Sequence, residues 1–167
     1  PEARFRVVIE QAWSLQEFLR RSGAAEAGEM ASRLRQGRFE LTALFGNMVT
    51  ELCGHETLYR ALYPARAMAR RFGVDIVSAE HNDVPGISWG LCRVLADADI
   101  RLFCPTIPHY YRLGGLDLAP HWDERAIFGR PGPGAFWWEA PSGRRGLFWF
   151  ANGRPAGQGF AYPGSLE

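Results

Sequence analysis

Residues 74–104, VDIVSAEHNDVPGISWGLCRVLADADIRLFC, decide the fold of this chain. The β-branched run at 74–79 predicts a buried strand, and the Pro-Gly pair that comes later predicts a turn. Residues 88–98 place apolar side chains on one face at helical spacing, and the apolar run at 100–104 predicts a second strand. A strand, a helix and a strand in this order predict a β-α-β unit, in which the two strands are parallel.

The same alternation is found in the N-terminal part of the chain. We expect strands at 4–9 and 39–44, where apolar and β-branched residues gather. We expect helices at 13–19, 29–36 and 54–72, where apolar residues recur at helical spacing. Strands that are apolar throughout are covered on both faces, so helices are expected to flank the sheet.

Several local signals refine these helices. Ser14 and Glu17 have the spacing of a capping box for the first helix. Pro64 predicts a kink in the helix at 54–72, and Gly73 predicts its C-terminal cap.

The alternation weakens after Pro105. Residues 105–135 are rich in Pro, Gly and His and are expected to form a long loop. Residues 136–139 and 146–150 then predict either a β-hairpin or one strand that carries a hairpin insertion.

These patterns predict an α/β fold of parallel strands with flanking helices. The chain has 167 residues, of which 47% are hydrophobic, which suits one globular domain. Four or five strand–helix units can form part of a barrel or lie in an open sheet. In both cases functional residues lie at the carboxyl ends of the strands.

Composition excludes several classes of protein. The formal net charge is +1, so the chain is not a strongly basic nucleic-acid binder. No apolar run approaches the roughly 18 residues of a membrane span, and the first residues lack a signal-peptide layout. We therefore expect a cytoplasmic protein with no nucleic-acid or membrane partner. Cys53, Cys92 and Cys104 are expected to be reduced, because their spacing fits neither a disulfide framework nor a zinc motif.

Polar and aromatic side chains follow the predicted strands. These residues are Glu10, Gln11, Trp13, Asn47, Glu51, Glu80, His81, Asn82, Asp83, Thr106, His109, Tyr110, Trp137, Trp138 and Glu139. Each of them alone has a structural explanation; Asp83, for example, is well placed to form a turn before Pro85 and Gly86. Their coincidence at one edge of the sheet predicts a functional site there.

A family resemblance adds to this interpretation. Residues 78–103, SAEHNDVPGISWGLCRVLADADIRLF, resemble the nucleophile segment of the glycoside hydrolase family 38 α-mannosidases and their bacterial relatives. Asp83 and Gly86 match the Asp and Gly of that segment. The resemblance extends to ELTALFGNMVTELCGHETLYRALYPARAMARRFG at 40–73 and to FWWEAPSGRRGLFWF at 136–150.

The resemblance implies that residues 1–167 are a single partial catalytic domain from a (β/α)7-type barrel. The family begins its barrel with an H-x-D motif that supplies two zinc ligands, and no H-x-D lies in or before the first predicted strand at 4–9; the H-x-D triplets of this sequence stand later, at 81–83 and 121–123. We therefore expect the first strand and the later strands to be missing. A further His ligand and the acid/base carboxylate come from later strands in the family. Asp83 would be the one zinc ligand in this chain, which should bind zinc weakly and hydrolyse no glycoside by itself.

The activity that the resemblance implies is retaining hydrolysis of a glycosidic bond in a carbohydrate substrate. Asp83 would attack the anomeric carbon. The substrate-binding residues would be Glu10, His81, Asn82, His109, Trp138 and Glu139. Of these, His81 and Asn82 would orient the nucleophile, and Trp138 would offer an apolar face to the sugar.

Two alternatives stay open. A metal-dependent carbohydrate deacetylase uses a related incomplete barrel, but it would need an H-x-x-x-H at a strand end, which this sequence lacks. A catalytically silent carbohydrate-binding relative, or a non-enzymatic α/β domain, would share the fold without the chemistry.

Overall fold

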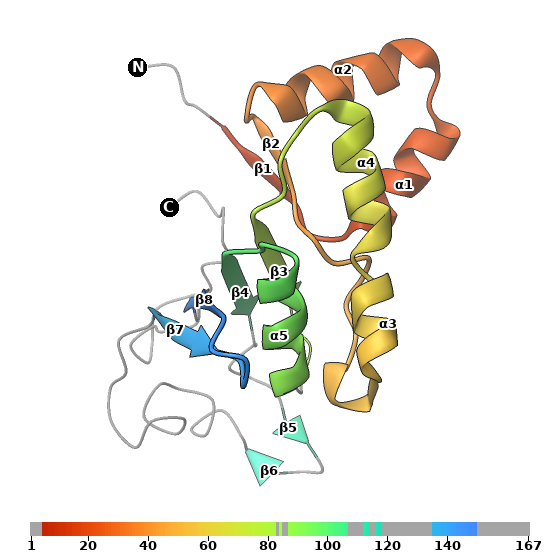
Figure 1. Ribbon diagram of the computed structural model, residues 1–167. Coiled ribbons are helices and arrows are strands. Elements are labelled where there is room, and N and C mark those ends of the chain that lie inside the picture. The colour runs from red at the N-terminus through yellow and green to blue at the C-terminus, as the bar shows by residue number, and fades with distance from the viewer. Residues whose placement is uncertain are drawn as a thin grey trace.

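The structure is a computed structural model that describes residues 5–82, 84, 87–106, 112–113, 116–117 and 135–149. It is an α/β fold in which helices and short parallel strands alternate along the chain (Figure 1). The helical segments are α1 Ala12–Arg21, α2 Ala24–Arg35, the 3-10 turn Thr50–Leu52, α3 His55–Arg60, α4 Tyr63–Phe72 and α5 Trp89–Asp97. The strands are β1 Val7–Ile9, β2 Phe39–Leu41, β3 Ser78–Asn82, β4 Leu102–Thr106, β5 Arg112–Leu113, β6 Leu116–Asp117, β7 Ala135–Glu139 and β8 Arg145–Trp149.

The strands form two parallel ladders that meet at β3. β1 pairs in parallel with β2, and β3 pairs in parallel with β4. The Ala43 amide, just beyond β2, donates a hydrogen bond of 2.9 Å to the Ser78 carbonyl of β3, so the two ladders are neighbours. β8 adds to β4 in parallel, and β7 pairs with β8 in the antiparallel sense. The parallel pairing expected for the first four strands is confirmed, whereas closure into a barrel stays a prediction.

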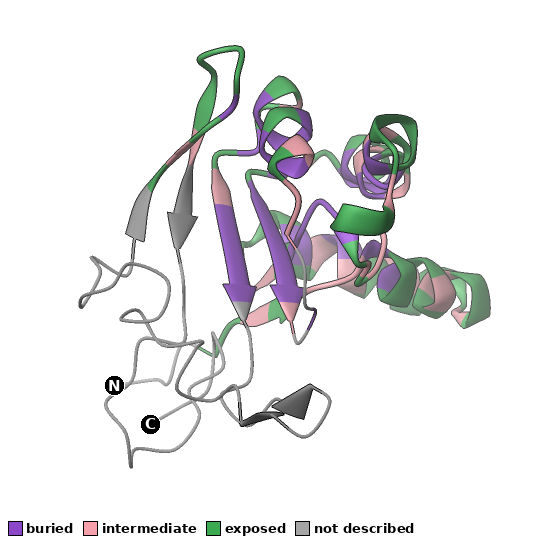
Figure 2. Cartoon of the chain, turned by 90° about the horizontal axis from the view of Figure 1, so that it is seen from below, coloured by how far each residue is buried: buried purple, intermediate pink, exposed green. Residues whose placement is uncertain are grey.

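The two faces of the sheet differ because side chains alternate along a strand. On one face Ala79 and Phe103 belong to a continuous apolar core with the helices. Figure 2 shows β3 and β4 as the buried centre of the molecule. On the opposite face lie Ser78 and Glu80 of β3, in register with Leu102 and Cys104 of β4. Burying a leucine-sized side chain contributes roughly 2 kcal/mol, so the helix-covered face supplies most of the stability.

β3 begins four residues later than the sequence predicts. Residues 74–77 of the expected strand at 74–79 form no strand. Strand pairing begins at Ser78 and continues through the mostly polar segment Ser78–Asn82. The Val77 carbonyl accepts hydrogen bonds from the amides of Arg101 and Leu102 at 2.8 and 3.1 Å. The start of β3 is therefore set by its pairing with β4. The apolar character of residues 74–77 does not determine where the strand begins.

Two of the predicted helices begin or end at other residues than expected. The expected helix at 54–72 is two helices, α3 and α4, and Pro64 lies in the first turn of α4, where its missing N–H costs nothing. The expected capping box of Ser14 and Glu17 is wrong: Gln11 is the N-cap of α1. Ser14 lies inside the helix, and Glu17 pairs with Arg20 instead.

α2 is longer than expected. It begins at Ala24, whereas the sequence predicts a start at residue 29. The Glu26 carboxylate accepts a hydrogen bond from the Gly23 amide at 2.8 Å, which satisfies one free N–H at the helix start. The alanines of this segment are strong helix formers and offset the cost of Gly28.

The three cysteines are free; Cys92 and Cys104 are buried, and Cys53 is half-buried. In the described ranges, every helix is too short or too polar to traverse a lipid bilayer. The predicted loop at 105–135 falls mostly outside the described residues, which include the small antiparallel pair of β5 and β6.

The two glycines Gly73 and Gly28 should respond to alanine with opposite signs. Gly73 caps α4 with φ 65° and ψ 44°, a left-handed conformation, so Gly73→Ala should lower the free energy of unfolding by about 1 kcal/mol. Gly28 lies within α2 with open space around it, so Gly28→Ala should raise the free energy of unfolding by up to about 1 kcal/mol. Urea denaturation measures both, and equal effects of the two substitutions would contradict the assigned backbone conformations.

Candidate functional site

The carboxyl ends of the parallel strands meet around Asn82. Asn82 is the last residue of β3 and is in register with Thr106, the last residue of β4. Glu10 follows β1, and Asn47 comes after β2. The structure brings Glu10, Asn47 and Asn82 together, as the strand-end prediction requires.

The peptide unit of Asn82 is held from two sides. The Glu10 carboxylate accepts a hydrogen bond from the Asn82 amide, with 2.8 Å between nitrogen and oxygen. The Asn47 side-chain amide donates to the Asn82 carbonyl at 2.9 Å. Glu10 is itself anchored, because the buried Thr42 hydroxyl donates to its backbone carbonyl at 2.5 Å. The end of β3 is therefore fixed immediately before Asp83, which lies outside the described residues.

Glu80 is a buried carboxyl on the same strand. It is 9% exposed and lies on the same face of β3 as Ser78, whose hydroxyl donates to the Glu40 carboxylate. Burial, followed by the negative charges of Glu10 and Glu40, raises the pKa of the Glu80 carboxyl to about 7. At neutral pH a large fraction of Glu80 therefore holds a proton.

Cys104 lies beside Glu80 in the register of β3 and β4. Burial, with a smaller contribution from the charge of Glu80, raises the pKa of the Cys104 thiol to about 12. The sulfur is therefore a neutral thiol and not a nucleophilic thiolate at neutral pH.

His81 faces the opposite way, into the helix-covered layer. It is 1% exposed, and its ring meets the edge of the Phe103 ring with 5.8 Å between centroids. Burial lowers the pKa of its imidazole to about 4, and neither ring nitrogen has a hydrogen-bond partner. The structure thus places His81 in the core, on the other face of the sheet from Glu80.

Trp138 and Glu139 are not brought to Asn82. Trp138 stacks on Phe103 with 5.7 Å between ring centroids. Glu139 is in register with Arg145, the first residue of β8, and β8 runs parallel to β4. The turn between β7 and β8 therefore lies where β3 and β4 begin, as Figure 2 shows, at the opposite end of the sheet from Asn82. The sixth predicted binding residue, His109, lies outside the described residues.

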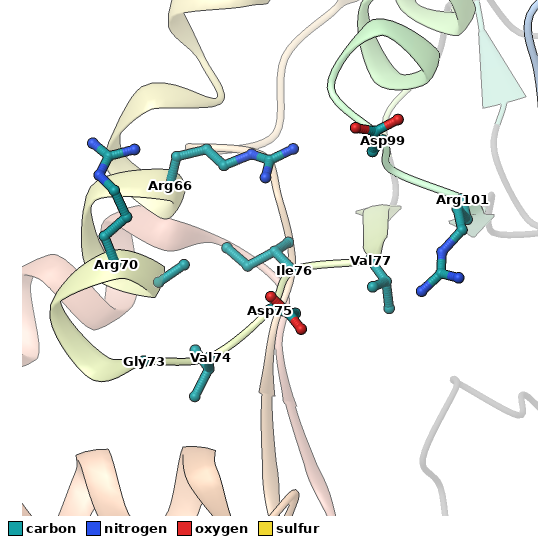
Figure 3. Close-up of a pocket in the computed structure, with 10 residues that line it drawn as sticks. Arg66, Arg70, Gly73, Val74, Asp75, Ile76, Val77, Asp99 and Arg101 are labelled. Carbon is teal, nitrogen blue, oxygen red and sulfur yellow. The ribbon is translucent and has the colours of Figure 1, made fainter.

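A cavity lies at the far end of the sheet. It has a volume of about 760 Å³ and is lined by the segment that leads into β3 and by Asp99 and Arg101, which precede β4 (Figure 3). Figure 3 shows that its arginine side chains point in different directions. One of them, Arg66, donates to the Ala98 carbonyl. This cavity does not coincide with the predicted site.

The described residues do not fit a zinc ion. Within the ranges that the structure covers, no group of three His, Cys, Asp or Glu side chains is arranged to hold a metal. Near Asn82, Glu10 already binds a backbone amide, and the imidazole of His81 lies on the other face of the sheet. The role of Asp83 as a zinc ligand stays a prediction.

The sequence places Glu80 among the residues that follow the predicted strand at 74–79, but not among the substrate-binding residues, and it does not single out Glu40. The structure puts Glu80 inside β3, on the same face as Ser78, because side chains alternate along a strand. Glu40 lies near Glu80 because β2 is the neighbour of β3 in the structure. No local sequence pattern reveals that these two strands are neighbours.

Comparison with known proteins supports the fold. No protein-family model matches the chain, and no curated protein matches its sequence. Among solved structures it is similar to the crystal structure of a 4-alpha-glucanotransferase from Thermococcus litoralis, with a TM-score of 0.61 and 15% sequence identity. The match covers 87% of this chain and 21% of that chain, so this sequence spans about a fifth of the length of that structure. The likeness shows a shared α/β fold, while membership of glycoside hydrolase family 38 stays a prediction.

Glu80 should make the stability of the protein depend on pH. The folded state keeps the Glu80 proton up to about pH 7, whereas the unfolded chain loses it near 4.5, so stability falls as pH rises through this window. Glu80→Gln should remove that fall and be about 2 kcal/mol more stable than the native protein at pH 8. Urea denaturation at pH 5 and pH 8 measures the difference. Glu51→Gln, at an exposed position, is the control, and identical pH dependence in Glu80→Gln and the native protein would refute the assignment.

His81 should act in the opposite direction. Because its folded pKa is depressed to about 4, stability is full above about pH 6.5 and falls as the pH drops towards 4. His81→Leu removes a buried ring with two unpaired nitrogens and should flatten this acid limb without loss of stability at pH 7. Thermal unfolding between pH 4 and 7 is the measurement, with the exposed His55→Leu as control. A large loss of stability in His81→Leu at pH 7 would reveal polar partners for this ring.

Proposed function

We propose that this chain is part of an enzyme that acts on glycosidic bonds, with Asp83 as its nucleophile. The observation that carries the proposal is the fixed Asn82 peptide at the carboxyl ends of the strands, held by Glu10 and Asn47. In parallel α/β folds this is the end where catalytic residues gather. The name of the structurally similar protein, a 4-alpha-glucanotransferase, supports a carbohydrate substrate.

The mechanism follows from a carboxylate at that position. Asp83 attacks the anomeric carbon and forms a covalent glycosyl-enzyme, while a second carboxyl group protonates the departing oxygen. Water then attacks the same carbon, and the sugar leaves with its original configuration. Each of these steps needs the nucleophile placed within a fraction of an ångström, because misplacement of a reacting group is costly.

Glu10 and Asn47 act as positioning residues in this proposal. A hydrogen bond to a charged group contributes about 1.5–3 kcal/mol, so the bond from the Asn82 amide to Glu10 restrains the peptide that joins His81 to Asn82. The bond from Asn47 restrains the carbonyl of the same residue. Together they reduce the freedom of the chain from which the nucleophile projects.

The finer substrate that we propose is an α-mannoside. Its support is the resemblance of residues 78–103 to the nucleophile segment of the family 38 enzymes, with Asp83 and Gly86 at the matching positions.

Replacement of Asp83 by Asn in the intact protein should abolish turnover of 4-nitrophenyl α-mannoside. The amide keeps the shape of the side chain but removes the attacking charge, so kcat/KM should fall by roughly 10³-fold or more. Asp75→Asn is the matched control, because Asp75 precedes β3 and lies at the opposite end of this strand. Turnover by Asp83→Asn close to that of the native protein would mean that Asp83 is only a turn residue.

A further inference from the structure

Two exposed tryptophan side chains lie beside β7, which is an edge strand among the described residues. Trp137 of β7 is 60% exposed, and Trp89, the first residue of α5, is 61% exposed. Tryptophan is highly buried on average in folded proteins, and it is enriched where a protein surface binds a partner. The pair therefore indicates a binding surface on the β7–β8 hairpin, whose turn end is exposed (Figure 2).

Both indoles are held in place in the free protein. The Trp89 indole nitrogen donates a hydrogen bond of 2.7 Å to the Glu139 carbonyl of β7. The Arg145 guanidinium lies over the Trp137 ring, 4.9 Å from its centroid, and covers one face of that ring. The 60% exposure leaves the rest of the Trp137 side chain open to solvent. A ligand that stacks on these rings therefore finds them already ordered, which lowers the entropy lost on binding.

Two charged side chains of opposite sign complete this surface. Side chains alternate along β7, so Trp137 and Glu139 lie on the face opposite Trp138, which stacks on Phe103. Arg145 is in register with Glu139 across the hairpin, and both side chains are exposed. The carboxylate accepts hydrogen bonds and the guanidinium donates them. The surface therefore suits a ligand that has no net charge, an apolar ring face and many hydroxyl groups.

A partner protein does not fit this edge of the sheet. An added strand would need the outward carbonyl of Glu139, which already accepts the Trp89 indole, and the Cys92 thiol donates to the Trp138 carbonyl at 3.4 Å. The two indoles, each about 60% exposed, offer at most roughly 300 Å² of contact area. A stable protein interface buries about 800 Å² on each partner. The exposed rings therefore match a ligand of a few rings better than a protein.

We propose that Trp89, Trp137, Glu139 and Arg145, which we call the hairpin surface, bind a neutral polysaccharide chain. The apolar face of a sugar ring stacks on an indole, and the sugar hydroxyl groups exchange hydrogen bonds with the carboxylate and the guanidinium. This inference rests on the proposed function, which supplies carbohydrate as the class of ligand. It goes beyond that function because it adds a second binding surface that takes no part in bond cleavage.

The hairpin surface is separate from the candidate site at the strand ends. Trp137 is in register with Leu147 of β8, and Leu147 is in register with Leu102, the first residue of β4. Asn82 is in register with Thr106, the last residue of β4. Four residues along a strand correspond to about 13 Å, so a glycoside with one sugar ring cannot contact both places. The role that follows for the hairpin surface is to hold a long substrate on the protein.

Electrophoresis of the intact protein through native gels that contain a polysaccharide tests the proposal. Yeast α-mannan and glycogen are neutral and differ in their sugar, whereas polygalacturonate is charged. We expect at least one neutral polymer to retard the native protein, and polygalacturonate to leave its mobility unchanged. Trp137→Ala should weaken the binding by at least about tenfold, as estimated from the loss of the stacked ring. Trp13→Ala is the matched control, because Trp13 is also half exposed but lies on α1.

Two further variants separate stacking from general apolar contact. Trp137→Phe keeps a flat ring and should retain most of the binding, whereas Trp137→Leu keeps an apolar side chain without a ring and should lose it. All three Trp137 variants should keep the native kcat/KM for 4-nitrophenyl α-mannoside, which carries one sugar ring. Binding by Trp137→Leu equal to that of the native protein would overturn the stacking assignment.

The remaining outcomes distinguish this inference from the proposed function. No retardation of the native protein by mannan or glycogen, or equal retardation of Trp137→Ala, would refute the hairpin surface while turnover of the nitrophenyl mannoside upheld the proposed function. A change of oligomeric state in Trp137→Ala, measured by analytical ultracentrifugation, would also refute it, because the surface would then join copies of the chain. Retardation that depends on Trp137 without turnover by the native protein would uphold the hairpin surface and refute the proposed function.

Discussion

The rest of the structure depends on the pairing of β3 with its two neighbours. β3 receives the Ala43 amide from the β1–β2 side and the full β4 ladder on the other, so it joins the two halves of the sheet. Its last residue, Asn82, is also the point that Glu10 and Asn47 hold. Loss of β3 would separate the ladders and release the strand end at which the candidate site is built.

This central strand is unusual in its polarity. Parallel strands buried between helices are ordinarily rich in Val, Ile and Leu, whereas β3 reads Ser-Ala-Glu-His-Asn. Glu80 and His81 are both buried, on opposite faces of the strand, and neither ring nitrogen of His81 has a hydrogen-bond partner. Both groups avoid the cost of a buried charge by remaining neutral, which is why their pKa values move in opposite directions.

The two faces of this strand differ in their chemistry. The apolar layer of Ala79, Phe103 and Trp138 stabilises the helix-covered face. The other face holds Glu10, Glu40 and Glu80, whose mutual repulsion is tolerated because hydrogen bonds to Asn82 and Ser78 offset part of it. Proteins that place charge on a buried face in this way commonly use it for chemistry.

The sequence by itself determined the class of the fold and the grouping of polar residues at the carboxyl ends of its strands. Alternating apolar runs and helical spacing predicted parallel strands with flanking helices, and the carboxyl ends of those strands gave Glu10, Asn47 and Asn82 as neighbours. Only the tertiary structure decided where β3 begins, because its pairing is set by β4. It also decided that His81 faces the core and that Trp138 and Glu139 lie at the opposite end of the sheet, because β8 joins β4 in parallel. Strand order and direction depend on contacts between distant residues, which no local pattern encodes.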